Sequence, residues 1–193
     1  MSQRMNYNAV SPAGMKALGA VYGYIRQSGL ASRLIDLVYL RVSQINGCAY
    51  CIEAHSRDLL KAGLPVEHLV LVGVWPESGD IFDEQERAAL AWAEAVMHLG
   101  DRGVPDSAYE AAAAVFDEKQ LADLTIAIGL MNTYNRMAIS FRATPMAAGR
   151  SVGPTQYLNL NDEGEPHETI SHHRDGSGAA RRVQPGPAHG AGP

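Results

Sequence analysis

Apolar residues recur every three or four positions through most of the chain up to Pro145, and this spacing predicts a series of α-helices. The first predicted helix begins at Ser11-Pro12, where the serine can cap the helix and the proline fits its first turn. The second is capped by Ser32 and stops at Gly47. Its length of about four turns favours a helix over a buried strand.

The second predicted helix is apolar nearly all round between Leu34 and Ile45. Such a helix is buried in a core or shared with a partner subunit. Asp36 and Arg41 are the only charged residues in this stretch. A charge in so apolar an element is normally paired or functional, but Arg41 can also extend to the surface and Asp36 can lie on an exposed strip. The sequence leaves both interpretations open.

The later helices have clear start and stop signals. A third helix runs from Cys48 to Gly63. Asp83 to Glu86 and Asp117 to Gln120 each form a capping box, which starts a further helix. The second box begins the longest predicted helix, which stops ahead of Pro145. A buried asparagine on this helix, such as Asn135, needs hydrogen-bond partners in another helix or subunit.

These elements predict an all-α fold, compact and built from many helices, over residues 1–150. The composition changes at residue 151, because the segment from there to the end holds seven glycines, five prolines and few large apolar side chains. Such a segment buries too little apolar surface to offset the entropy lost on ordering. We therefore predict one helical domain, residues 1–150, followed by a disordered low-complexity tail, residues 151–193.

Composition and charge narrow the class of protein. The net charge is -5, aromatic residues make up 7% of the chain, and no basic block is present, which argues against a nucleic-acid partner. The N-terminal residues are polar, and the longest apolar run, Leu69 to Trp75, is far too short to span a bilayer. We expect a soluble, cytoplasmic protein without a membrane partner.

The stretch with the most distinctive chemistry is Asn46 to His55, which holds both cysteines of the chain in one Cys-x-x-Cys motif. On a helix, Cys48, Cys51 and His55 occupy positions i, i+3 and i+7, so they share one face. Two cysteines do not make the disulfide framework of a small secreted protein. The pattern therefore indicates redox or metal chemistry.

Dithiol redox chemistry uses all three residues of this face. A thiolate attacks an O–O or S–S bond, and helix N-terminal amides with a nearby histidine lower the pKa of a thiol from about 8.5. A second thiol within reach then converts the sulfenic acid to a disulfide before further oxidation. The spacing does not establish which cysteine attacks.

Two other interpretations compete with redox chemistry. The motif supplies two zinc ligands and His55 a third, but a closed zinc site has four, so His68 or His98 would have to be recruited. The cysteines can also be two small buried residues without chemistry. The single cluster and its adjacent histidine favour redox chemistry over both.

The stretch Arg41 to Cys51, followed by His55 and Ala62-Gly63, closely resembles the alkylhydroperoxidase D-like branch of the carboxymuconolactone decarboxylase family. The stretches Asp83 to Ala93 and Asp123 to Arg142 are also similar to that branch. The resemblance covers roughly residues 12–145 and leaves the tail unmatched.

The resemblance implies an AhpD-like all-helical fold that assembles into homo-oligomers, trimers or hexamers, with active sites near subunit contacts. It also implies a thiol-dependent peroxidase. By the resemblance, Cys51 attacks the hydroperoxide, Cys48 resolves the sulfenic acid, and His55 accepts a thiol proton. An outside dithiol, either a lipoyl protein or a thioredoxin-like protein, then reduces the disulfide. No metal, flavin or haem is required.

This chain departs from the family pattern at two positions. Better-studied members carry a glutamate twelve residues before the first cysteine, where this chain has Asp36, which is one methylene shorter. Proton relay through Asp36 is expected, with Glu86 as the alternative carboxylate, although the capping box is the simpler role for Glu86. Those members also have a histidine just before the second cysteine, where this chain has Tyr50, which has an ordinary pKa near 10.

Two alternative functions stay open at this point. One is a decarboxylase or lactone-processing lyase, which needs no dithiol. The other is a non-enzymatic redox sensor, in which the disulfide changes an interface. Intact activity in a Cys48→Ser/Cys51→Ser double mutant would indicate the lyase. Slow peroxide consumption despite easy disulfide formation would indicate the sensor.

Overall fold

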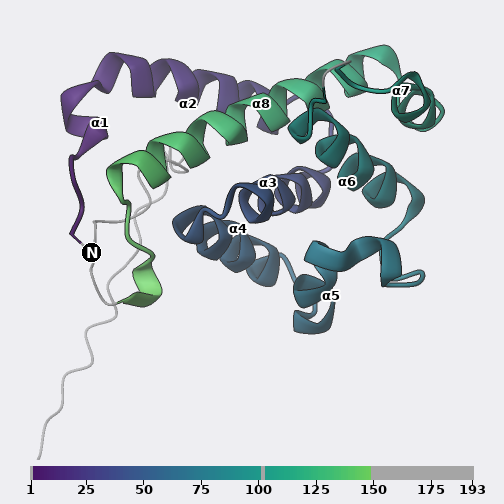
Figure 1. Ribbon diagram of the computed structural model, residues 1–193, viewed down its shortest axis with the longest axis horizontal. Helices are drawn as coiled ribbons and strands as arrows, with labels where there is room; N and C mark the ends of the chain where they lie inside the picture. Colours follow the sequence, from purple (N-terminus) through teal and green to yellow (C-terminus); the bar gives the residue numbers. More distant parts are fainter. Residues whose placement is uncertain (1, 101–102, 149–193) are drawn as a thin grey trace, which may run out of the picture. The chain divides into compact units, whose positions relative to one another are not determined.

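The computed structural model describes residues 2–100 and 103–148, and its regular elements in these ranges are helices (Figure 1). The predicted all-α fold is confirmed. The predicted tail, residues 151–193, lies outside the described residues, so its disorder and the boundary at residue 150 stay predictions. The elements are α1 (Tyr7–Val10), α2 (Pro12–Arg26), α3 (Ser32–Asn46), α4 (Ala49–Lys61), α5 (Val66–Leu71), η1 (Val72–Glu77), α6 (Glu84–Met97), α7 (Asp106–Ala113), α8 (Glu118–Phe141) and η2 (Met146–Ala148).

Local sequence signals set most of the helix ends. Gly47 ends α3 in the left-handed conformation, with φ of 67°, which glycine adopts without steric cost. Both predicted capping boxes are present, at the start of α6 and of α8. Ser32 is not the cap that we predicted for α3. The carbonyl of Ala31 accepts the N–H of Ile35 at 3.1 Å, so Ala31 is the cap and the helix begins at Ser32, one residue earlier than predicted.

Helix α3 lies at the centre of the described fold and packs against α4, α6 and α8 (Figure 1). One side, which includes Val38 and Tyr39, belongs to a hydrophobic cluster shared with α2, α6 and α8. The other side contributes Leu37 and Leu40 to a second cluster. The predicted buried helix is confirmed, and its apolar surface on all sides explains why it has neighbours on all sides.

Both charged residues in the apolar stretch of α3 are paired inside the fold. Arg41 binds Glu94 at 2.7 Å, and the indole N–H of Trp75 donates to the same carboxylate at 2.9 Å. Asp36 binds Arg26 of α2. Of the two interpretations that the sequence left open, the structure therefore supports paired charges. No helix in the described ranges is both long enough and apolar enough to cross a membrane.

Candidate active site

The two cysteines lie at the start of α4, as predicted. Cys48 occupies the cap position, and its sulfur accepts the N–H of Cys51 at 3.3 Å. The two sulfurs are joined as a disulfide, with the Cα atoms 5.3 Å apart. Backbone N–H groups at a helix start stabilise a thiolate, so the reduced pair lies where thiol reactivity is raised.

Hydrogen bonds to α8 hold the turn that carries the cysteines. The side-chain amide of Asn46 donates to Asn132 at 3.0 Å and to Asn135 at 2.9 Å. The amide of Asn135 donates in turn to the hydroxyl of Ser43 at 3.0 Å. Asn135 is fully buried, and its predicted need for partners in another helix is confirmed. These bonds fix the end of α3, and hence Cys48, against α8.

His55 lies one turn after Cys51 in a closed apolar environment. Its side chain is buried, its Nδ1 atom has no hydrogen-bond partner among the described residues, and its ring centre is 5.2 Å from that of Tyr39. Burial, and to a lesser extent the positive charge of Arg26, lower the pKa of His55 from 6.5 to about 3. His55 is therefore neutral at pH 7 in this disulfide form.

Asp36 binds Arg26, a partner that the sequence analysis did not identify. Both of its carboxylate oxygens accept hydrogen bonds from Arg26, at the last turn of α2. Arg26 also donates to the hydroxyl of Tyr22 at 2.8 Å and lies over the ring of Tyr39. Within residues 2–100 and 103–148, no hydrogen bond joins Asp36 to His55, and Arg26 is the residue that binds the Asp36 carboxylate.

Glu86 is not brought to the cysteines. One carboxylate oxygen accepts a hydrogen bond from Arg33 at 2.6 Å, and the other accepts the backbone N–H of Asp83 at 3.1 Å. The capping box and Arg33 therefore account for the contacts of this residue, and no hydrogen bond among the described residues links it to the thiols. The box favours an acidic residue at this position for a purely local reason.

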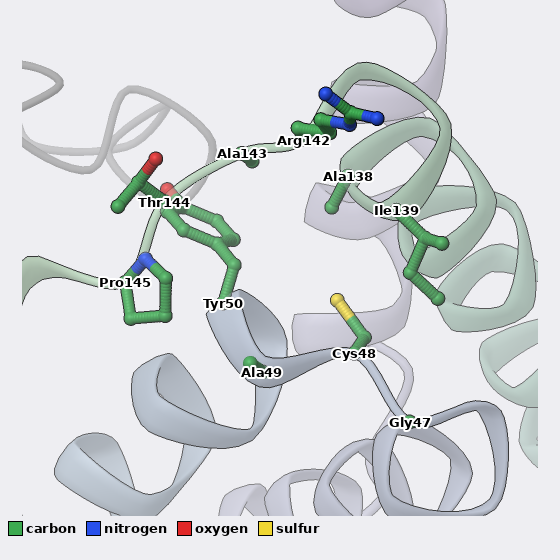
Figure 2. Close-up of a pocket in the computed structure, with 10 residues that line it drawn as sticks. All are labelled: Gly47, Cys48, Ala49, Tyr50, Ala138, Ile139, Arg142, Ala143, Thr144 and Pro145. Carbon is green, nitrogen blue, oxygen red and sulfur yellow. The ribbon is translucent and has the colours of Figure 1, made fainter. Parts of the chain in front are cut away.

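A cavity of about 400 Å³ lies between the start of α4 and the end of α8. In Figure 2 the sulfur of Cys48 points toward Ala138 on α8, while Thr144 and Pro145 lie on the other side of Tyr50. Cys51 does not line the cavity. The lining residues are Gly47, Cys48, Ala49, Tyr50, Ala138, Ile139, Arg142, Ala143, Thr144 and Pro145.

A zinc site was one of the competing interpretations of the cysteine pair. Among the described residues, no group of three or more histidine, cysteine, aspartate or glutamate side chains is arranged to hold a metal ion. The two histidines that a zinc site would have recruited lie elsewhere: His68 packs against Phe82, and His98 contacts the carbonyl of Glu94 at 3.0 Å.

Comparison with known sequences identifies a protein family and a related protein. The sequence model of the carboxymuconolactone decarboxylase family matches residues 12–95. YdfG, an uncharacterized protein of Bacillus subtilis, is 35% identical over 140 residues, which are 72% of this chain and 95% of YdfG.

Solved structures with the same fold include two AhpD-like proteins. A protein of unknown function from Agrobacterium tumefaciens, whose name refers to the antioxidant defence protein AhpD, is 41% identical with a TM-score of 0.71. The match covers 75% of this chain and 98% of that one. A peroxidase-related protein from Ralstonia eutropha, described as an alkylhydroperoxidase AhpD core, has a TM-score of 0.62 at 22% identity and covers 72% and 73%. At that identity the second match shows the fold alone.

Proposed function

Because the chain belongs to the alkylhydroperoxidase D-like branch of the carboxymuconolactone decarboxylase family, we propose that it is a thiol-dependent peroxidase that reduces hydroperoxides. The observation that carries the proposal is the Cys48–Cys51 disulfide at the start of α4, beside a cavity. Closing this disulfide releases two electrons, which is the number that converts a hydroperoxide to an alcohol and water.

The catalytic cycle has two bond-forming steps at sulfur. The Cys51 thiolate attacks the terminal peroxide oxygen, the O–O bond breaks, and the alkoxide takes up a proton and leaves as the alcohol. Cys51 is then a sulfenic acid. The Cys48 thiolate attacks the Cys51 sulfur, hydroxide leaves and is protonated to water, and the disulfide forms. The role of Cys51 as attacking thiol follows the family, and the adjacent His55 supports it.

His55 is the proton acceptor in this proposal. It follows Cys51 by one helical turn, is neutral at pH 7, and has an Nδ1 atom with no hydrogen-bond partner among the described residues. Its low pKa belongs to the disulfide form, which carries no negative charge at sulfur. In the reduced form, a Cys51 thiolate one helical turn before the ring would favour the imidazolium, because an opposite charge nearby stabilises it.

Asp36 acts on this site through Arg26 rather than by carrying a proton. Arg26 lowers the proton affinity of His55, and the Asp36 carboxylate neutralises part of that positive charge. Asp36 is therefore a positioning residue that tunes His55. Glu86 has no part in the proposed mechanism, because both of its oxygens are engaged at the start of α6.

An outside thiol reductant completes the cycle by opening the disulfide. The family resemblance favours a dithiol protein, lipoyl or thioredoxin-like, and a homo-oligomer, trimeric or hexameric, as the working assembly. Cytoplasmic location follows as an expectation, since the reducing cytoplasm regenerates thiols.

The experiment is a steady-state assay with cumene hydroperoxide as substrate and dithiothreitol as reductant. We expect wild type to consume the peroxide catalytically and the Cys48→Ser/Cys51→Ser double mutant to consume it no faster than buffer. A double mutant that keeps decarboxylase activity on a carboxymuconolactone substrate would support the lyase instead. A wild type that forms its disulfide readily but turns over no peroxide would support the redox sensor.

A further inference from the structure

The disulfide of the site is reached through the cavity between α4 and α8. Cys48 lines this cavity although it is only 1% exposed, and Cys51 does not line it. A disulfide is reduced when a thiolate attacks one of its sulfurs. The thiol of a reducing protein therefore enters the cavity to reach Cys48, and the body of that protein lies on the surface around the opening.

The segments that meet at the end of α8 carry no acidic residue. The backbone N–H of Arg4 donates to the carbonyl of Phe141 at 3.0 Å, so the start of the chain lies beside this end. Residues 2–35 and 124–148 contain arginines and a lysine but no aspartate or glutamate. Glu53 of α4 accepts the N–H of Ala147 at 2.9 Å, but Arg57 pairs with its carboxylate. The net charge of the chain is -5, yet this end is positive.

Three arginines at this end have no carboxylate partner. The ion pairs within residues 2–100 and 103–148 involve other side chains than those of Arg4, Arg136 and Arg142. Arg4 and Arg136 are exposed, and they donate to the α8 carbonyls of Ser140 at 3.0 Å and Asn132 at 3.3 Å. Arg142 caps α8, and in Figure 2 its guanidinium points away from the Cys48 sulfur. The three charges are therefore presented around the end of the helix rather than to the disulfide.

Exposed apolar side chains lie next to these charges. Ile139 lines the cavity and is 46% exposed, and it follows Arg136 by three positions, so the two are neighbours on the surface of α8. Met146, which follows the cavity residue Pro145, is 45% exposed. Arginine and methionine are both enriched at protein–protein interfaces, where apolar centres have polar rims. The surface around the opening therefore has the composition of a protein-binding site.

We propose that the end of α8 is the docking surface for the reducing protein, and that this partner is a dithiol protein with acidic side chains around its thiols. The proposal rests on the proposed function and describes the partner of the same site. A partner thiolate attacks the Cys48 sulfur, the Cys48–Cys51 bond breaks, and Cys51 leaves as a thiolate. The second partner thiol attacks the mixed disulfide, and Cys48 leaves. The partner becomes a disulfide and gives two electrons and two protons to the two cysteines.

Three synthetic dithiol peptides serve as probes of this surface. Each contains the sequence Cys-Gly-Pro-Cys, flanked on both sides by glutamates, by glutamines or by lysines. The disulfide form of the full chain is prepared with diamide, so the assay does not depend on peroxidase activity. Its reduction is followed at low ionic strength by quenched thiol labelling and intact mass. The ratio of wild-type to variant rate cancels the intrinsic reactivity of each peptide.

Arg136→Glu is the test variant, and Lys61→Glu is the matched control. Both residues are exposed and outside the described ion pairs, and both changes alter the net charge equally, but Lys61 lies at the opposite end of α4 from Cys48. We expect Arg136→Glu to slow the glutamate peptide about tenfold, to change the glutamine peptide less than about twofold, and to speed the lysine peptide. Lys61→Glu should change each rate less than about twofold. Equal effects of the two variants, or no slowing of the glutamate peptide by Arg136→Glu, overturn the proposal.

Ionic strength gives a second readout. Salt screens the attraction between exposed opposite charges, so the glutamate peptide should reduce wild type more slowly as the salt concentration rises from about 0.01 M to about 1 M. The same peptide should lose much less of its rate with Arg136→Glu/Arg142→Gln. Equal salt dependence in the two proteins overturns the proposal.

Two other occupants of this surface would give different results. If the chain's own tail covered it, neutralising the acidic residues at 162–168 by amide substitution would speed reduction by all three peptides. If a second copy covered it, Arg136→Glu would lower the mass found by sedimentation equilibrium. Either result overturns the proposal. A wild type that shows the expected charge effects but ignores hydroperoxides would contradict the proposed function and leave this inference standing.

Discussion

Arg26 holds both carboxylate oxygens of Asp36, and its Nη1 atom donates to Oδ2 at 3.1 Å. Burial alone would lower the pKa of Arg26, but the hydrogen-bonded carboxylate keeps that pKa above its ordinary value, so the guanidinium stays charged. The pair occupies the position at which the family pattern has a glutamate for proton relay. In this chain the carboxylate neutralises a buried cation near His55, which is a structural and electrostatic role.

Replacement of Asp36 by asparagine should destabilise the fold strongly. The change leaves the Arg26 guanidinium buried without its counter-charge, and breaking a pair of this kind costs about 3 kcal/mol or more. Urea denaturation of wild type and Asp36→Asn measures the loss. The Arg26→Met/Asp36→Asn double mutant is the control and should recover part of the stability. A loss below about 1 kcal/mol in the single mutant would contradict the buried-pair account.

The stability of the oxidised protein should depend on the protonation of His55. The pKa of His55 is about 3 in the folded protein and 6.5 when unfolded. Between these values the unfolded chain binds a proton that the folded chain does not, so stability falls as the pH is lowered from 6.5 toward 3. The slope is about 1.4 kcal/mol per pH unit. Denaturation of wild type and His55→Asn across this range measures it, and equal slopes in both proteins would contradict the prediction.

The Asn135 side chain should contribute more stability than that of Asn132. Asn135→Ala leaves the amide of Asn46 with one acceptor fewer and removes the donor to Ser43, at a cost of about 2 kcal/mol. Asn132 is only half-buried, and in Asn132→Ala the amide of Asn46 keeps its bond to Asn135. The two variants form a matched pair in denaturation experiments. Equal losses would mean that the buried network does not hold the turn before Cys48.

Glycine at position 142 should stabilise the fold. The left-handed backbone at this position favours glycine over other residues, so Arg142→Gly should raise the free energy of unfolding by about 1 kcal/mol. Arg142→Ala removes the same side chain without relieving the backbone, so it serves as the control. If Arg142→Ala gained as much as Arg142→Gly, the guanidinium rather than the backbone would be the source of strain.

The roles of the two cysteines can be separated by trapping. After reaction with one equivalent of hydroperoxide, Cys48→Ser should accumulate a sulfenic acid on Cys51, detected by dimedone labelling and mass spectrometry. Cys51→Ser should react more slowly, because its one remaining thiol, Cys48, is seven residues before His55, whereas Cys51 is only one helical turn before it. Faster labelling of Cys48 in Cys51→Ser would reverse the roles and favour the thiol that caps α4 and faces the cavity.

The helices were predictable because their signals are local. Gly47 and the capping boxes at Asp83 and Asp117 act within one turn, and the structure has all three where the sequence placed them. The shared face of Cys48 and Cys51 is equally local. Each of these features depends on residues at most a few positions apart.

The surroundings of the site were not predictable in the same way. Arg26 and Asp36 are ten residues apart, on consecutive helices, and they meet because of the way the chain turns between α2 and α3. The lone aspartate in an apolar helix predicted only that some partner exists. The cavity depends on how the end of α8 meets the start of α4, residues about ninety positions apart. Glu86 had two possible roles on the sequence; the structure shows the local one, the capping box with Asp83, and adds a contact with Arg33 that the sequence did not indicate.

The most direct test of the peroxidase account is a hydroperoxide titration of the fully reduced chain, followed by thiol counting and intact mass. The account predicts that wild type loses both thiols and two hydrogen atoms at one equivalent of hydroperoxide, with one equivalent of alcohol formed. Full retention of both thiols, with the hydroperoxide unconsumed, would contradict it.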